Sequence, residues 1–368
     1  MLVKRAAMKF LTCLCIVALT SSSAYAEVMR FELGGSENRC DDCGWIQATG
    51  EITTSTPADF EKFIHQFKNY PKTLRVNSSG GKVRAAIGLG RILRAKGFAT
   101  EVGSDLPVAA RGPSPLRTSE RTKGICVSAC VYAFLGGIRR SVDGEAQLGV
   151  HRFISQRARV QPNAPQFTKE DLDSLELLSD DLLLYVMEMG VNPLLIAVAG
   201  QAGSGDIRWI NEAEARALRI IYDPEAWKPW RVDTYHGGAI AISETNDGKI
   251  KMLASCSNRS GPVVVLTDLT QPDESWFKKN QTCASNGKHP VFGTFVDESR
   301  VDVLKLQAGG ASIRFRLTTN KPPLTSAAIF DPFSDRYPKA CTTNRYRGTS
   351  ENLKPAVTLA FRNCLQDN

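Results

Sequence analysis

The pattern of apolar residues changes near Asp223, and no other feature of the chain constrains its fold as strongly. Before this point, segments with strand-like alternation, such as residues 45–52, are followed by segments with helical spacing, such as Phe60, Phe63 and Ile64. After it, strand-like runs are separated by Gly, Asn and Pro turns. The pattern predicts an α/β domain over residues 27–223 and a smaller, mainly β domain over residues 224–368.

Within the first domain, Pro57 suits the first turn of a helix, and Gly97 is placed to end a second helix that begins near Lys82. Residues 103–123 are expected to form a long loop, residues 124–137 a buried helix, and residues 168–189 a long amphipathic helix. In the second domain, the strands expected at 239–243, 250–255, 262–266, 291–296, 301–306 and 311–317 indicate a sandwich or a small barrel.

The first 26 residues are typical of a secretory signal peptide. Basic residues near the start precede a short apolar run over residues 10–20, and Ala24-Tyr25-Ala26 provides a small-x-small cleavage pattern. We expect the mature chain to begin at Glu27 and to be soluble in the periplasm or secreted, because no later stretch is apolar enough to cross a membrane. A retained membrane anchor is the alternative.

The formal net charge of +8 does not predict nucleic-acid binding. Apart from short clusters such as Arg139-Arg140 and the segment 117–123, the basic residues are scattered, and no basic stripe is interleaved with aromatic residues. We therefore expect no nucleic acid among the partners of this protein.

Eight of the ten cysteines follow the predicted signal, and an even number in an exported protein favours disulfides over metal binding. In the second half, spacing suggests Cys256 with Cys283 and Cys341 with Cys364 as local pairs; in the first half, the pairing among Cys40, Cys43, Cys126 and Cys130 stays open. The acidic residues between Cys40 and Cys43 argue against a redox-active thiolate. A zinc site that uses these four cysteines is the minor alternative, because no histidine lies near them in the sequence. We expect neither a metal nor a cofactor.

Three short segments carry residue types that hydrolytic chemistry uses. The turn from Asn77 to Gly81 offers backbone N–H groups where a strand leads into a helix, as an oxyanion hole requires. Ser128 lies at the start of an apolar helix, and His151 lies at the end of a strand. Taken singly, these are also typical of a glycine turn, a helix-capping serine and a core histidine.

In combination they resemble the proteolytic subunit of the Clp protease. The resemblance follows the order and spacing of four segments: LRVNSSGGKVRAAIGLGRILRAKGFATEVG, CVSAC, GEAQLGVHRF and DIRWINEAEARAL. It covers roughly Trp45 to Asp223, about half of the mature chain, and implies the Clp/crotonase superhelix of ββα units. By this resemblance Ser128 is the nucleophile, His151 the general base, and Gly81 and Ala129 supply the oxyanion-hole N–H groups.

The residue that orients the histidine is less directly matched. The family has an aspartate just before the segment 208–211, but a comparison without gaps places Ile207 there and Asp206 one residue earlier. Asp206 is the expected third residue, and a Ser-His dyad is the alternative. Asp171 and Asp173 are more distant candidates that also suit a helix N-terminus.

The resemblance implies an exported serine peptidase that acts on peptides or unfolded protein, because ATP and an unfoldase partner are absent outside the cytoplasm. The loop 103–123 would cover Ser128 as a lid, and a bridge between Cys126 and Cys130 would stiffen the turn that holds it. The long helix 168–189 corresponds to the contact element between rings of the family, which implies a homo-oligomer.

Three other functions remain open. A catalytically inactive scaffold of the same fold would bind peptides or envelope partners. A Ser-Lys enzyme would use Lys82 or Lys123 in place of His151. An acyl-CoA crotonase is the weakest alternative, since coenzyme A is not expected outside the cytoplasm.

Overall fold

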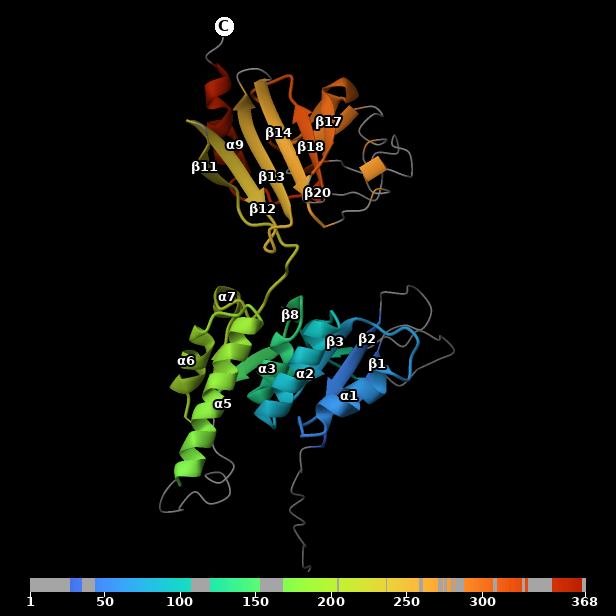
Figure 1. Cartoon of the computed structure of the whole chain (residues 1–368), viewed down its shortest axis with the longest axis vertical. Coiled ribbons are helices and arrows are strands. Elements are labelled where there is room, and N and C mark those ends of the chain that lie inside the picture. Colours follow the sequence, from blue (N-terminus) through green and yellow to red (C-terminus); the bar gives the residue numbers. More distant parts are fainter. Residues whose placement is uncertain are drawn as a thin grey trace, which may run out of the picture. The chain divides into compact units, whose positions relative to one another are not determined.

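The computed structural model describes residues 27–34, 44–106, 120–152, 168–203, 205–235, 237–257, 261–270, 274, 277–278, 281, 288–306, 310–325, 328–329 and 346–365. The chain divides into two compact units (Figure 1): residues up to Gly136 with Val142–Asn211, and Gly137–Ser141 with the residues from Glu212 onward. The predicted signal peptide and Cys40, Cys43, Cys283 and Cys341 lie outside the described residues.

Between Arg30 and Ile210, helices are interspersed with strands, as the sequence predicts. In chain order the elements are β1 (Arg30–Gly34), β2 (Trp45–Thr49), α1 (Thr56–Ile64), β3 (Thr73–Asn77), α2 (Val83–Ala95), β4 (Ala99–Val102), β5 (Ser104–Leu106), β6 (Glu120–Thr122), β7 (Ile125–Val127), α3 (Ala129–Leu135), β8 (Arg140–Val142), β9 (Gln147–Val150), α5 (Lys169–Glu188), α6 (Leu194–Gln201) and β10 (Arg208–Ile210).

Two sheets organise this unit. The larger has the order β1-β2-β3-β4-β8, with β2, β3 and β4 parallel and β1 antiparallel at the edge. The smaller has the order β10-β9-β7, with β7 and β9 parallel. Helix α2 packs against α1, α3 and α5, so the first three helices form one layer beside the large sheet. The expectation of an α/β unit is therefore confirmed, while the ββα superhelix stays a prediction.

The helices form where the apolar spacing places them. Helix α1 has a proline in its first turn and buries Phe60 and Ile64 on one face. Helix α2 ends before Gly97, whose φ of +70° is a conformation that a residue without a Cβ adopts readily.

Two expectations for the first unit need correction. Residues 103–123 are not all loop, because β5 and β6 pair as an antiparallel ladder at its two ends; residues 107–119 lie outside the described residues. Residues 124–137 are not all helix either, because 125–127 form β7 and the helix begins only at Ala129. The apolar pattern does not reveal where the strand ends and the helix begins, because a short buried strand and a buried helix have the same composition.

The second unit is dominated by antiparallel strands. Its elements are α7 (Glu212–Ala217), β11 (Arg231–Tyr235), β12 (Gly238–Glu244), β13 (Ile250–Ser257), β14 (Gly261–Asp268), β15 (Lys288–Val291), β16 (Thr294–Asp297), η1 (Glu298–Arg300), β17 (Val301–Lys305), β18 (Ala311–Arg316), β19 (Ala328–Ile329), β20 (Tyr346–Arg347), α9 (Leu353–Phe361) and η3 (Arg362–Leu365). Residues 291–296, expected as one strand, are divided by the turn between β15 and β16.

A six-stranded sheet with the order β11-β12-β13-β14-β18-β17 carries the core of this unit. Helix α9, which the apolar pattern did not predict, packs on β11, β12 and β13 (Figure 1). Val291, Phe292 and Val296 from the β15–β16 hairpin belong to the same core as Phe315 of β18. One face of the sheet is thus covered by a helix and by a hairpin that belongs to a second sheet, with the order β16-β15-β19-β20. The expected sandwich or barrel stays a prediction.

The cysteine pairing expected for the second half is also wrong. Cys256 of β13 is bonded to Cys364 of η3, and not to Cys283. The spacing favoured local pairs, but the packing of α9 on β13 brings the end of the chain back to that strand. The bridge therefore fastens the terminal helix to the centre of the sheet.

Candidate active site

The turn that carries Ser128 is the most unusual piece of backbone in the first unit. Strand β7 ends at Val127 and helix α3 begins at Ala129, so Ser128 is the single residue between them. Its φ of 59° and ψ of −125° lie in a region that residues with a Cβ rarely adopt. A serine on a sharp, strained turn from strand to helix is the local geometry of a nucleophile elbow.

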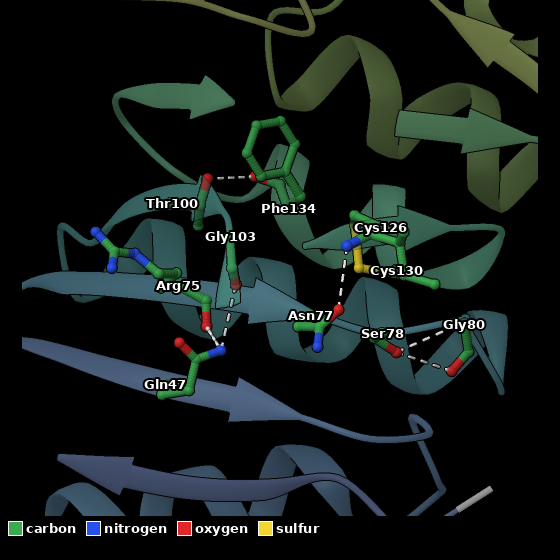
Figure 2. Close-up of a disulfide and its surroundings, with 11 residues drawn as sticks. Gln47, Arg75, Asn77, Ser78, Gly80, Thr100, Gly103, Cys126, Cys130 and Phe134 are labelled. Atoms are coloured by element: carbon green, nitrogen blue, oxygen red, sulfur yellow. Dashed lines mark hydrogen bonds between the residues drawn. A yellow bond between two sulfur atoms is a disulfide. The ribbon is translucent and has the colours of Figure 1, made fainter. Parts of the chain in front are cut away.

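Segment 77–81 is fastened alongside this turn. Ser78 exchanges two backbone hydrogen bonds with β7: its N–H donates to Ile125 O over 2.8 Å, and Val127 N–H donates to Ser78 O over 3.0 Å. The Asn77 side chain accepts from Ile125 N–H over 3.0 Å, as Figure 2 shows beside the disulfide. The end of β3 is therefore held against β7, directly before Ser128.

Gly80 lies where no side chain fits. An ideal Cβ on Gly80 would be 2.8 Å from Ser128 Cβ, 2.8 Å from Val127 O and 3.2 Å from Ala129 N. Its φ of 113° is a further reason for glycine. The turn 77–81 thus contacts the turn that carries Ser128, as the sequence hypothesis of a shared site requires.

Two backbone donors at this junction have no partner among the described residues. Within the described part of the chain, neither Gly81 N–H nor Ala129 N–H donates a hydrogen bond, whereas Gly80 N–H donates to Ser78 Oγ over 3.1 Å. Ala129 is the first residue of α3, where orphan N–H groups and the helix dipole favour an anion. These are the two donors that the sequence analysis assigns to an oxyanion hole.

His151 directly follows β9, the strand beside β7. The two strands are parallel with Val127 opposite Gly149, and Ser128 N–H donates to Gly149 O over 2.9 Å. Because the carboxyl ends of adjacent parallel strands meet at one edge of the sheet, Ser128 and His151 lie at the same edge. Both are half-buried, which leaves each side chain partly open to solvent.

The hydrogen bond of His151 defines its tautomer. Nδ1 lies 2.8 Å from Arg152 O, and because a carbonyl oxygen can only accept, Nδ1 carries the proton. In the neutral ring, Nε2 is then the acceptor that a general base needs. A backbone carbonyl thus occupies the place that the sequence analysis gives to an aspartate.

Asp206 lies in the loop that precedes β10. Its carboxylate is beside Gly203, where Oδ2 would be 2.9 Å from an added Cβ, and no hydrogen bond joins Asp206 to His151 among the described residues. Strand β10 pairs with β9 with Arg208 opposite Val150, and Ile207 Cγ2 would be 2.5 Å from an added Cβ on Gly149. The assignment of Asp206 as the third residue stays a prediction.

Two of the other candidates, Lys123 and Asp173, have surroundings of their own. Lys123 Nζ pairs with Glu145 over 3.1 Å, and Asp173 is exposed near the start of α5. Burial raises the pKa of Tyr132 in α3, so this phenol stays protonated. No group of His, Cys, Asp and Glu that could hold a metal ion is found in the part of the chain that the structure describes.

Cys126 and Cys130 are bonded to each other across Ser128. This resolves the open pairing for two of the four cysteines in the first half, and it fits an oxidising compartment. Among the described helices, none combines the length and the apolar character that a membrane span needs. Sequence reasoning missed Ser78, whose buried hydroxyl and backbone fasten the glycine turn; its only signal is its place beside the two glycines.

Comparison with known proteins leaves the family open. No protein-family model matches the chain, and no curated protein matches it. Solved structures with partial likeness include ClpP1 from Listeria monocytogenes, at 16% identity over 46% of this chain and 84% of that one, with a TM-score of 0.30. A mutant of the 1510-N membrane-bound stomatin-specific protease shows 15% identity over 48% and 75%, with a TM-score of 0.32.

Proposed function

We propose that the first unit is a serine hydrolase that cleaves peptide bonds, with Ser128 as nucleophile and His151 as base. The observation that carries the proposal is the backbone of Ser128, a strained single-residue link between β7 and α3 that lies against Gly80. Strain of this kind costs folding free energy, so its presence at a serine beside free N–H donors favours a functional role.

The chemistry follows from the donors and acceptors at the junction. His151 Nε2 accepts the proton of Ser128 Oγ as Oγ attacks a carbonyl carbon, and the N–H groups of Gly81 and Ala129 stabilise the oxyanion that forms. His151 then donates that proton to the leaving amine, which leaves an acyl-enzyme at Ser128. A water molecule, deprotonated by His151, hydrolyses the acyl-enzyme and restores the hydroxyl.

The orientation of His151 in this proposal rests on Arg152 O, which accepts from Nδ1. Asp206 is the alternative orienting group, which would require its loop to move. The substrate class, peptides or unfolded protein, and an oxidising compartment outside the cytoplasm follow the sequence resemblance, and the buried disulfide beside Ser128 supports the compartment.

The test is covalent labelling of the full chain with a fluorophosphonate probe. We expect labelling of the wild type, none of Ser128→Ala, and a rate reduced by about 100-fold or more in His151→Ala, because proton transfer to the base accompanies attack. Ser179→Ala, at a serine whose hydroxyl donates to Leu175 O on α5, is the control and should label normally.

Asp206→Asn separates the two ways of orienting the base. A rate close to wild type supports the Arg152 carbonyl, and a loss comparable with His151→Ala supports the aspartate. A folded wild-type protein that the probe does not label would contradict the hydrolase and favour the inactive scaffold.

A further inference from the structure

The Cys126–Cys130 disulfide closes a very small ring around the proposed nucleophile. Cys126 lies in β7 and Cys130 in the first turn of α3, with a sequence separation of 4 and a Cα–Cα distance of 5.2 Å. The residues inside the ring are Val127, Ser128 and Ala129, which include the nucleophile and one oxyanion donor of the proposed function.

The ring encloses the strained part of the backbone. A positive φ at a residue with a Cβ persists only where the surroundings determine it more strongly than the local preference does. Here the surroundings supply Ser128 N–H to Gly149 O, at 2.9 Å, and Val131 N–H to Ser128 O, at 3.1 Å. The disulfide adds a covalent link between the two elements that the strained residue joins (Figure 2).

The Cys126–Cys130 disulfide is buried inside the first unit. Both cysteines are fully buried, among α3 residues that are buried as well. A reductant can therefore reach the sulfur atoms only when the turn opens. Such burial is unlike that of a catalytic dithiol, which must be partly exposed to exchange with its substrate.

We propose that this disulfide is a positioning device that makes assembly of the Ser128 site conditional on oxidation, an inference that rests on the proposed function. With the bond intact, the ring holds Ser128 and Ala129 N–H in the geometry described. When a dithiol supplies two electrons and two protons, Cys126 and Cys130 become thiols, the dithiol becomes a disulfide, and the turn is released.

Release affects the turn more than the core. A buried thiol behaves as a small apolar group, so the packing of α3 is kept when the bond is broken. Ser128 then relaxes toward a more favourable backbone conformation. This change moves Ser128 Oγ and Ala129 N–H away from the positions that the reaction requires. The site loses its activity while the unit remains folded.

The test compares two double variants of the full chain. Cys126→Ala/Cys130→Ala removes the ring, and Cys256→Ala/Cys364→Ala removes the other disulfide as a matched control. The limiting rate of fluorophosphonate labelling should fall on the order of 100-fold in the first variant, because a misplacement of about 1 Å has an effect of that size. The probe concentration that half-saturates the rate should stay the same, and the control should label at the wild-type rate.

Hydrogen exchange gives a readout that does not depend on activity. Peptides that cover 125–135 should exchange faster in the first variant and in dithiol-treated wild type, with the rest of the first unit unchanged. A wild-type labelling rate, or unchanged exchange in 125–135, would overturn the inference. Global unfolding of the variant would also overturn it, in favour of a plain structural cross-link.

The two readouts separate this inference from the proposed function. Failure of the wild type to label contradicts the hydrolase but leaves the exchange experiment to decide whether the disulfide positions the turn. Normal labelling in both double variants keeps the hydrolase and removes the positioning role.

Discussion

The first unit closes its disulfide across a sequence separation of 4, and the second unit closes its own across a separation of 108. In the chain-entropy description, the short loop contributes about 2 kcal/mol to the free energy of unfolding and the long loop about 5 kcal/mol. The short bridge surrounds one strained residue, whereas the long bridge joins the last helical turn to the centre of a sheet.

The difference teaches that the same covalent bond serves two purposes in this chain. In the second unit a broad apolar core defines the packing, and the bridge restricts the unfolded chain. In the first unit the bridge contributes less to global stability than the long bridge does, and its position around Ser128 favours control of local geometry. Global stability and the local geometry of Ser128 can therefore be measured separately.

The largest effect on stability is expected from the long bridge. Cys256→Ala/Cys364→Ala should lower the free energy of unfolding of the second unit by about 5 kcal/mol, because the loop it closes is long. Denaturant unfolding followed by hydrogen exchange of peptides from β13 and α9 measures the loss. A loss no greater than that of Cys126→Ala/Cys130→Ala would contradict the comparison.

A smaller effect, confined to the first unit, is expected from Gly80→Ala. The added Cβ would lie 2.8 Å from Ser128 Cβ at a φ of 113°, so strain and crowding together should cost about 3 kcal/mol. Labelling of Ser128 should fall sharply, while exchange in the second unit stays as in wild type.

Gly88→Ala is the control for this prediction. Gly88 lies inside α2, where the nearest atom to an added Cβ is 3.5 Å away on Pro57. The change should stabilise the first unit by about 0.5–1 kcal/mol, because alanine favours a helix interior more than glycine does. Equal labelling losses in both glycine variants would show that Gly80 has no special contact with the site.

The smallest effect concerns Glu244 in the second unit, which pairs with Lys228 over 3.1 Å and with Lys251 over 3.2 Å. Burial raises the pKa of Glu244, but the hydrogen bonds from both lysines outweigh it and hold the pKa below its ordinary value of 4.5. A lowered folded-state pKa contributes stability above pH 4.5, and this contribution is lost as the pH falls through the folded-state pKa.

Glu244→Gln should therefore reduce stability at neutral pH by less than about 1 kcal/mol. The difference from wild type should shrink as the pH is lowered through the acidic range below 4.5. Urea unfolding at a series of pH values measures it. A difference that grows toward low pH would have the wrong sign for a paired carboxylate.

Much of the first unit could be predicted from local sequence. The apolar face of α1, the end of α2 before Gly97 and the long helix α5 follow from spacing and turn residues within a few positions. The order of the turn 77–81, Ser128 and His151 in the sequence also singled out the segments of the candidate site. The short strand β7 was missed, since periodicity cannot distinguish three buried residues in a strand from the start of a helix.

The detailed geometry of the candidate site could not be predicted in this way. Three features depend on how β3, β7 and β9 pair. They are the contact of Gly80 with Ser128, the backbone hydrogen bonds between Ser78 and β7, and the hydrogen bond from His151 Nδ1 to Arg152 O. Sequence similarity suggested an aspartate for the last of these roles. The peptide carbonyl next to the histidine gives no signal in the amino-acid pattern, because every residue has one.

The sequence by itself determined the change from alternating elements to repeated strands near Asp223, and it singled out Ser128 and His151 as candidates. Only the tertiary structure decided that Cys256 pairs with Cys364, that α9 covers part of the sheet, and that Ser128 takes a positive φ. The reason is the range of the forces: periodicity and turn preference act over a few residues, whereas cross-links and strained turns depend on segments that folding brings together.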